Sequence, residues 1–232
     1  MNIRDLIDGA VRKSEEEYQK KEKTDKLRPH TFGQCLRRQY YFYKGEPETN
    51  PKDDRTRRVL YVGTFFHKLI QDLAIAKYPD ALIEEPVEDL YISGKADIVH
   101  EEEVVDIKTQ HSYAFHHMKD KLIADARPEA CLQIMAYATR LNKDFARLSF
   151  ISKDDLCIAE YCIPVTAEWA EKVETEIATL NEMRNKDWFP PAVPRLYGLD
   201  SKKKPKECEM YCNWKNKCQG ECDGNNKHNT KT

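Results

Sequence analysis

The chain has 232 residues, and because a typical domain holds roughly 150 residues, this length predicts one large domain with additions. Hydrophobic residues make up 40% of the chain and charged residues 34%, which supplies enough apolar side chain for a packed interior and excludes a wholly disordered or collagen-like protein. The 38 Lys and Arg residues against 40 Asp and Glu residues give a net charge of −2, so any nucleic-acid binding must use local basic patches.

The first ten residues contain Arg4, Asp5 and Asp8 where a signal peptide would need an apolar run. No stretch of about 18 apolar residues follows, so no membrane-spanning helix is expected. We therefore expect a soluble, cytoplasmic protein. Its eight cysteines would then sit in a reducing compartment, which favours metal ligation over a disulfide framework.

In the first half of the chain the pattern predicts two helices followed by strands. Residues 1–28 predict an amphipathic helix with a charged connector, ended by Pro29, and its apolar positions are Ile3, Leu6, Ile7 and Val11. Residues 60–76 predict a helix that buries one wide apolar face, formed by Leu60, Phe65, Phe66, Leu69, Ile70 and Leu73. Segments rich in β-branched residues predict strands at 82–83, 90–92, 98–99 and 104–107.

The second half predicts a helix, a hairpin and a third long helix. Pro128 suits the first position of a helix that carries Leu132, Ile134, Met135 and Tyr137. Residues 147–151 and 157–163 alternate like a hairpin around a polar turn at 152–155, and Thr166 suits the N-cap of the last helix. These elements predict a mixed α/β fold with helices flanking a central sheet.

The segment from Gly94 to Lys108 reads as a hairpin with its turn at Glu101 and Glu102. In that register the numbers of antiparallel partners sum to 203, which places Asp97 opposite Asp106. Opposed side chains have Cβ atoms only about 5 Å apart, and like charges there are destabilising unless something neutralises them. Because side chains alternate with period two, Lys108 shares the face of Asp106.

Two carboxylates with room for water suit Mg²⁺ or Mn²⁺. Such an ion polarises a phosphate oxygen and activates water, and a neighbouring ammonium orients that water or offsets charge in the transition state. The chemistry implied is phosphodiester hydrolysis. A surface hairpin with merely solvated acids has the same spacing, so spacing alone leaves both interpretations open.

Three motifs in one order resemble a known family. Gly94-x-x-Asp97 followed by Asp106-x-Lys108 is similar to the signature of the PD-(D/E)XK nuclease superfamily. Gly63-Thr-Phe-Phe-His67 on the preceding helix and Gln133-x-x-x-Tyr137 on the following helix resemble the RecB-like branch. With the cysteines described below, the resemblance spans roughly residues 31–222.

The resemblance implies a restriction-endonuclease-like core and a metal-dependent deoxyribonuclease. It implies that the ligands of Mg²⁺ or Mn²⁺ are His67, Asp97, Asp106 and the backbone carbonyl of Ile107. Lys108 would act on the attacking water. Gln133 and Tyr137, four residues apart on one helix face, would contact the DNA backbone or support the site. A supporting acid found in some relatives has three candidates, Glu84, Glu85 and Glu88.

Four cysteines lie close together near the end of the chain, at positions 208, 212, 218 and 222, and Cys35 lies near its beginning. Four thiolates can hold zinc or an iron–sulfur cluster, and the short middle gap disfavours a zinc ribbon. The resemblance to iron–sulfur exonucleases of the RecB-like branch implies a 4Fe-4S cluster that joins both chain ends, held by Cys35, Cys208, Cys212 and Cys218. Cys222 in place of Cys35, and zinc in place of the cluster, are the alternatives.

The remaining cysteines, Cys131, Cys157 and Cys162, are expected to be plain buried thiols because their surroundings in the sequence are apolar. Cations and aromatic rings interleave at Arg37, Arg38, Tyr40 and Tyr41, which is the mixture that binds a single strand by phosphate contact and stacking. The lysine run at 202–206 could serve DNA or be solvated surface.

The sequence therefore predicts an amino-terminal helix and connector (1–28), a nuclease core (29–200), a cysteine cluster (201–222) and a disordered tail (223–232). The expected function is a DNA exonuclease acting on single-stranded DNA, ends or overhangs, with 5′ to 3′ polarity implied by the resemblance. An endonuclease or recombination nuclease and a non-catalytic DNA-binding adaptor are the alternatives. The resemblance implies a bacterial, archaeal or virus-infected cell, with CRISPR adaptation or phage or host recombination as the setting.

Overall fold

The computed structural model describes residues 2–21, 25–186, 188–192 and 206–218. Four helical elements precede the sheet: α1 (Ile3–Lys21), the 3-10 turn η1 (Pro29–Thr31), α2 (Leu36–Tyr43) and α3 (Asp54–Lys77). Strands β1 (Leu82–Glu88), β2 (Ser93–His100) and β3 (Glu103–Gln110) follow. The rest comprises α4 (Ser112–Met118), α5 (Ile123–Ala126), α6 (Pro128–Arg140), β4 (Phe145–Ser152), β5 (Ile158–Pro164), α7 (Ala167–Asn185) and α8 (Lys206–Tyr211).

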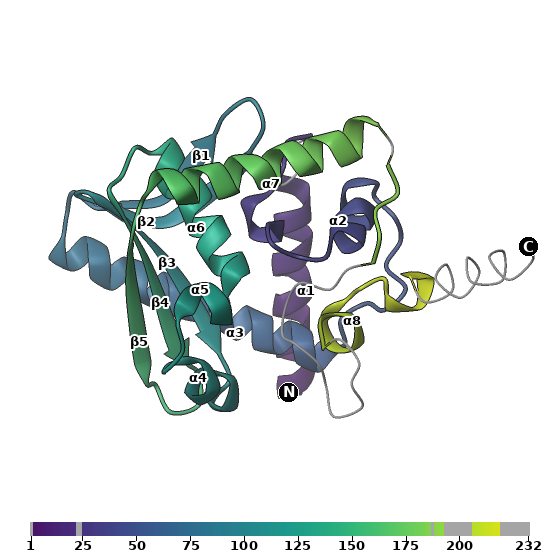
Figure 1. The fold of residues 1–232 in the computed structure, drawn as a ribbon. Helices are drawn as coiled ribbons and strands as arrows, with labels where there is room; N and C mark the ends of the chain where they lie inside the picture. Colours follow the sequence, from purple (N-terminus) through teal and green to yellow (C-terminus); the bar gives the residue numbers. More distant parts are fainter. Residues whose placement is uncertain (1, 22–24, 187, 193–205, 219–232) are drawn as a thin grey trace, which may run out of the picture.

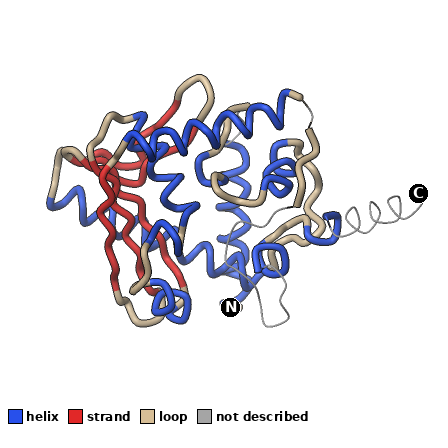
Figure 2. Tube along the Cα trace, viewed as in Figure 1, coloured by secondary structure: helices blue, strands red, loops and turns tan. Residues whose placement is uncertain are grey.

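The five strands form one mixed sheet in the order β1-β2-β3-β4-β5, and helices lie beside it (Figures 1 and 2). Strands β3 and β4 are parallel, and every other neighbouring pair is antiparallel. A parallel pair needs a crossover connection, which α4, α5 and α6 provide between β3 and β4. The predicted α/β fold with a central sheet flanked by helices is confirmed.

The larger core lies between the sheet, α6 and α7. Its fully buried side chains include Ile134 and Met135 of α6, Leu148 and Phe150 of β4, and Leu180 of α7. Each such side chain contributes about 1.5–3 kcal/mol when it leaves water. Because α6 is held firmly against the middle of the sheet, side chains on its sheet-facing side have fixed positions relative to β2 and β3.

A smaller core lies under α3 on the other face of the sheet. Phe66 and Ile70 pack there against Ile98, Ile107 and Ile151. The helix begins where Asp53 accepts a hydrogen bond from the Thr56 amide at 2.7 Å.

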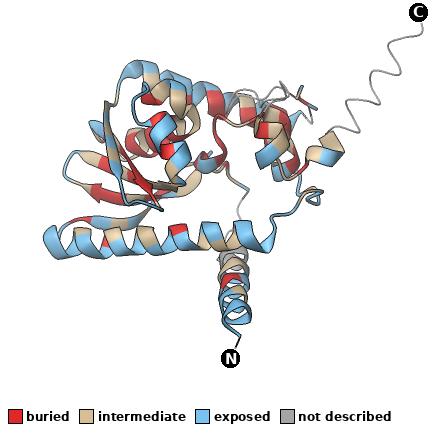
Figure 3. Ribbon diagram, turned by 90° about the horizontal axis from the view of Figure 1, so that it is seen from below, coloured by how far each residue is buried: buried red, intermediate tan, exposed pale blue. Residues whose placement is uncertain are grey.

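The prediction that the whole apolar stripe of α3 is buried was wrong. Leu60, Phe65, Leu69 and Leu73 are each more than half exposed, because only one row of the helix reaches the sheet (Figure 3).

The amino-terminal helix also differs from the prediction. Of its four apolar positions only Val11 is buried, while Ile3, Leu6 and Ile7 are exposed. Ion pairs join α1 to α3 instead, namely Asp8 with Arg58 and Glu15 with Arg57. The helix ends at Lys21 rather than at Pro29, which starts the next turn.

Most later elements agree with the prediction. Pro128 opens α6, β4 and β5 form the predicted hairpin, and Thr166 caps α7 by accepting from the Trp169 amide at 3.4 Å. The predicted strand at 90–92 was wrong, because the Asp89 carboxylate accepts from the amides of Tyr91 and Ile92 and closes a turn there. None of the helices in the described part of the chain is both long and apolar enough to span a bilayer.

Candidate active site

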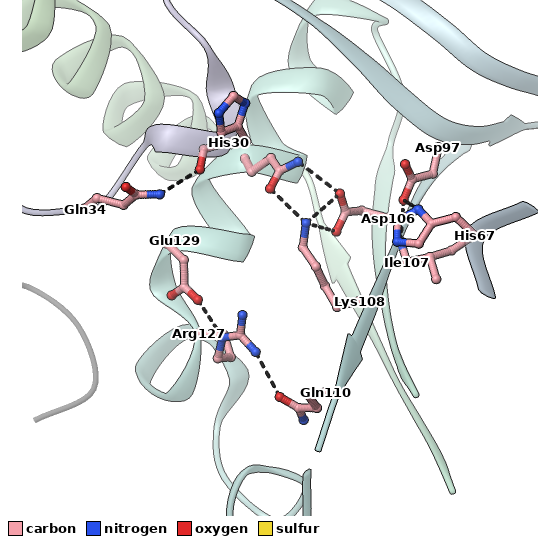
Figure 4. A network of polar contacts seen from close by, with 11 residues as sticks. His30, Gln34, His67, Asp97, Asp106, Ile107, Lys108, Gln110, Arg127 and Glu129 are labelled. Carbon is pink, nitrogen blue, oxygen red and sulfur yellow. Dashed lines mark hydrogen bonds and ion pairs between the residues drawn. The ribbon is translucent and has the colours of Figure 1, made fainter. Parts of the chain in front are cut away.

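The predicted hairpin register is confirmed. Ile98 pairs with Val105, Val99 with Val104 and His100 with Glu103, and the residue numbers of each pair add up to 203 as predicted. Glu101 takes a positive φ of 46° in the turn. The paired ladder ends at Ile98 and Val105, so Asp97 and Asp106 come next, where β2 and β3 begin to separate. Their carboxylates face different partners: that of Asp97 faces His67, and that of Asp106 faces Lys108 and Gln133 (Figure 4).

Asp97 accepts a hydrogen bond from the Ile107 amide at 2.7 Å through its Oδ2 atom. The same oxygen is 3.3 Å from Nδ1 of His67, which α3 brings over the open end of the ladder (Figure 4). Burial disfavours the protonated imidazole, but the carboxylates of Asp97 and Asp106 outweigh it and raise the pKa of His67. The Asp–His pair thus spans helix and sheet.

Asp106 is 2% exposed, and Lys108 lies beside it. The Lys108 Nζ atom donates to Oδ1 at 3.1 Å and is 2.8 Å from Oδ2, which has no aligned hydrogen-bond donor. Burial raises the pKa of Asp106 to about 6, although Lys108 opposes the shift. Lys108 is the cation that offsets the cost of burying this carboxylate.

Gln133 of α6 completes the polar network. Its Oε1 atom accepts from Lys108 Nζ at 2.9 Å, and its Nε2 atom donates to Asp106 Oδ1 at 3.2 Å. One amide therefore orients both the ammonium and the carboxylate. Nearby, Arg127 donates hydrogen bonds to the side chains of Gln110 and Glu129, which connects the end of β3 to the start of α6.

Tyr137 lies one turn beyond Gln133 and is only 3% exposed. Its ring packs directly on Gly94, where a Cβ atom would be 2.7 Å from the tyrosine hydroxyl. Of the two roles expected for Tyr137, contact with DNA or support of the site, burial favours support. Gly94 is required because the aromatic ring occupies the space of a side chain.

Gln71 is a site residue that the sequence motifs missed. It is buried one turn after His67, and its Nε2 atom donates to Glu84 Oε1 at 2.9 Å and to the Asp97 carbonyl at 3.3 Å. Its spacing of four residues from His67 was the available signal. Glu84 has a positive φ of 51° and interrupts the β1–β2 pairing opposite Asp97, so it is the acid next to the site among the three candidates.

The donor set fits a divalent metal. The His67 imidazole lies 3.3 Å from the Asp97 carboxylate, and the charge of the buried Asp106 carboxylate acts on both groups. Carboxylate and imidazole are ligand types that Mn²⁺ and Mg²⁺ accept together with water. The assignment of His67, Asp97, Asp106 and the Ile107 carbonyl as the metal ligands stays a prediction.

The fold is shared with solved structures of other proteins. No family model and no curated protein matches the sequence. The crystal structure of SSO0001 is similar with a TM-score of 0.59 and 20% identity, covering 92% of this chain and 94% of that one. An alkaline exonuclease, LHK-Exo from Laribacter hongkongensis, is similar with a TM-score of 0.51 and 11% identity, covering 70% and 89%. At these identities the similarity establishes the fold alone.

The two ends of the chain meet at the predicted cysteines. The Cys35 amide donates to the buried Glu207 carboxylate at 2.7 Å, across 172 positions of sequence. Burial, together with the charges of Cys35, Cys212 and Cys218, raises the pKa of Cys208 to about 12. Four thiols gathered in this way are costly to ionise without a cation, which suits a metal centre. Cys222 lies outside the described residues, and the cluster itself stays a prediction.

Two of the residues predicted to contact DNA, Arg37 and Tyr41, are buried, and their role in DNA binding stays a prediction. Arg37 donates to the Pro190 carbonyl at 2.9 Å and stacks on Phe189, and the ring of Tyr41 packs against Trp214. Both residues therefore hold the carboxyl-terminal segment in place. Tyr40 is half-buried against Phe189.

Arg38 keeps an accessible position. It lines a hollow of about 240 Å³ together with His30, Lys52, Phe42 and Trp214. Residues 202–204 lie outside the described residues. The expectation of three plain buried thiols holds for Cys131 and was wrong for Cys157 and Cys162, which are exposed because the β4–β5 turn and β5 lie at the sheet edge.

Proposed function

We propose that this protein is a Mg²⁺- or Mn²⁺-dependent DNA exonuclease. The observation that carries the proposal is that two pairs, His67 with Asp97 and Lys108 with Asp106, lie at the open end of the β2–β3 ladder, near enough for their charges to interact. Two acids, an imidazole and an ammonium in one neighbourhood support phosphodiester hydrolysis over a binding role. The fold, which is similar to that of an alkaline exonuclease, supports the same reaction class.

In this proposal His67, Asp97, Asp106 and the Ile107 carbonyl hold the metal. When bound, the ion supplies Lewis-acid activation of the phosphate and a lowered pKa for water. Lys108 orients the attacking water or offsets charge at the phosphate. Gln133 keeps the ammonium of Lys108 in place, since it accepts one of its protons.

The DNA strand would reach this centre past the hollow lined by Arg38, Lys52 and Trp214, which combines cations and rings as single-strand sites do. Single-stranded DNA, its ends or overhangs, and 5′ to 3′ polarity are proposed from the family resemblance. A 4Fe-4S cluster on Cys35, Cys208, Cys212 and Cys218 would fix the carboxyl-terminal segment. CRISPR adaptation or phage or host recombination would be the setting.

End-labelled single- and double-stranded DNA, incubated with Mg²⁺, Mn²⁺ or chelator, tests the reaction and its polarity together. Asp97→Asn should abolish cleavage while keeping an acceptor for the Ile107 amide. Asp72→Asn, an exposed exchange on the same α3 helix as His67, is the matched control and should cleave normally. Equal activity in all three proteins, or activity in chelator, would overturn the proposal.

One further substrate and a binding measurement distinguish the alternatives. Cleavage of circular single-stranded DNA would replace the exonuclease assignment with an endonuclease. Tight DNA binding without cleavage under any metal would assign an adaptor. Brown colour with broad visible absorption would support the iron–sulfur cluster, whereas colourless protein with stoichiometric zinc would remove it.

A further inference from the structure

A second group of metal-ligating side chains lies at one end of the sheet, apart from the residues described above. His116 of α4 and Asp155 of the β4–β5 turn are joined by a contact of 2.9 Å between Nε2 and Oδ2. The ligand atoms of His116, Asp155 and Cys157 all lie within 4.8 Å of one another. All three side chains are exposed, so a cation can reach them from solvent.

The protein backbone holds these three residues in place before any ion binds. The Asp155 carboxylate accepts from the Cys157 amide at 3.3 Å, and Leu156 between them takes a positive φ of 58°. A second contact joins the same two elements, since Asp154 accepts from the Ser112 amide at 2.7 Å. The helix and the turn are therefore already docked, and little ordering remains for a ligand to impose.

The charge at this position suits a cation. The Asp155 carboxylate supplies negative charge beside the His116 ring, and the two side chains are 39% and 43% exposed. A second carboxylate, that of Asp154, lies 3.5 Å from His111 at the start of the same helix and adds to the negative charge at this end of the sheet.

We propose that His116, Asp155 and Cys157 form a second metal site, which takes a thiophilic divalent cation such as Zn²⁺. Thiolate, imidazole and carboxylate with one water complete a tetrahedral zinc set, and zinc bond lengths of about 2.0–2.3 Å place ligand atoms about 3.3–3.6 Å apart. Exposed side chains need to move only about 1 Å to reach that spacing. Mg²⁺ prefers oxygen ligands, so it should bind this site more weakly than Zn²⁺, which accepts thiolate and imidazole.

A bound ion would cross-link α4, which directly follows the catalytic strand β3, to the turn that joins β4 and β5. Local opening of α4 would then require loss of a metal–ligand bond. The inference is independent of the proposed nuclease reaction, because none of its three residues belongs to that site.

Cobalt binding to the full chain tests the site, because Co²⁺ replaces zinc and its thiolate bond gives a near-ultraviolet charge-transfer band. Wild-type protein, Cys157→Ser, His116→Ala and Cys162→Ser would be titrated with Co²⁺ under reducing conditions and excess Mg²⁺. Cys162→Ser is the matched control, since Cys162 is an exposed thiol on the neighbouring strand. Any ion held by the four clustered cysteines is common to all four proteins and cancels in the comparison.

We expect wild type and Cys162→Ser to bind one more equivalent of Co²⁺ than Cys157→Ser and His116→Ala, with a weaker charge-transfer band in Cys157→Ser than in wild type. Zinc should also slow amide hydrogen exchange at 111–118 and 152–157 in the wild-type protein. It should leave the exchange of these segments unchanged in Cys157→Ser and His116→Ala. Equal stoichiometry and equal exchange in these three proteins would overturn the site, whatever the outcome of the nuclease assay.

Discussion

The hairpin of the candidate active site and the cysteine cluster both bring ligand side chains together, but over very different lengths of chain. Asp97 and the Ile107 amide that fixes it are ten positions apart. Cys35 and Glu207 are 172 positions apart. The hairpin can therefore lose a side chain and keep its fold, whereas the cluster region depends on the whole core to assemble and in turn fastens the chain ends.

The largest expected effect is chemical and falls on the hairpin. Lys108→Ala should lower the cleavage rate by about 10²–10³-fold, because the ammonium beside Asp106 is lost. Its melting temperature should also fall, because the buried Asp106 carboxylate loses its ammonium partner, so cleavage is measured at a temperature where the variant is folded. Lys172→Ala, a surface lysine of α7, serves as control and should leave both quantities unchanged. A Lys108→Ala protein with full activity would contradict the assigned role.

The second effect falls on the cluster region and is structural. Cys35→Ser should destabilise the protein by up to about 4 kcal/mol, because a cross-link over so long a loop restricts the unfolded chain most. Denaturant unfolding and visible absorption would be measured together. If colour and stability both match those of Cys131→Ser, a change at a buried thiol outside the cluster, then Cys35 is not a ligand.

A smaller effect tests the packing under the hairpin. Gly94→Ala should cost about 1–3 kcal/mol, since its new Cβ would lie 2.7 Å from the hydroxyl of the buried Tyr137. Gly9→Ala in α1 meets no atom within 4 Å and should be neutral or stabilising. Thermal unfolding of both variants separates the two cases, and equal melting temperatures would show that Tyr137 can move.

The smallest expected effect is the pH dependence of metal binding. Folding raises the pKa of Asp106 to about 6 and also raises the pKa of His67. The folded, metal-free protein therefore keeps these protons up to a higher pH than the unfolded chain does. The site's own contribution to stability is therefore present at low pH and is lost as the pH rises through 6 and above. Added Mg²⁺ competes with those protons, so the rise in melting temperature that it produces should be larger at pH 7.5 than at pH 5. Asp97→Asn should abolish that rise at both values.

Sequence reasoning was strongest where chemistry and periodicity are local. The register of the hairpin followed from its turn, and Thr166 and Pro128 marked the starts of their helices, because caps and turns depend on neighbouring residues. It was weakest where packing decides exposure. The α3 stripe was predicted to be buried, yet Leu69 and Leu73 face solvent, since no pattern along one helix reveals how much surface its partner covers.

The amino-acid sequence by itself determined the alternation of the strands, the spacing of Asp97, Asp106 and Lys108, and the set of cysteines at both ends. Only the tertiary structure decided that Arg37 and Tyr41 are buried, that Gln71 and Gln133 hold the site, and that Cys157 lies beside His116. The reason is physical: spacing fixes what neighbours along one element can do, whereas burial and convergence arise from elements that meet only after the chain has folded.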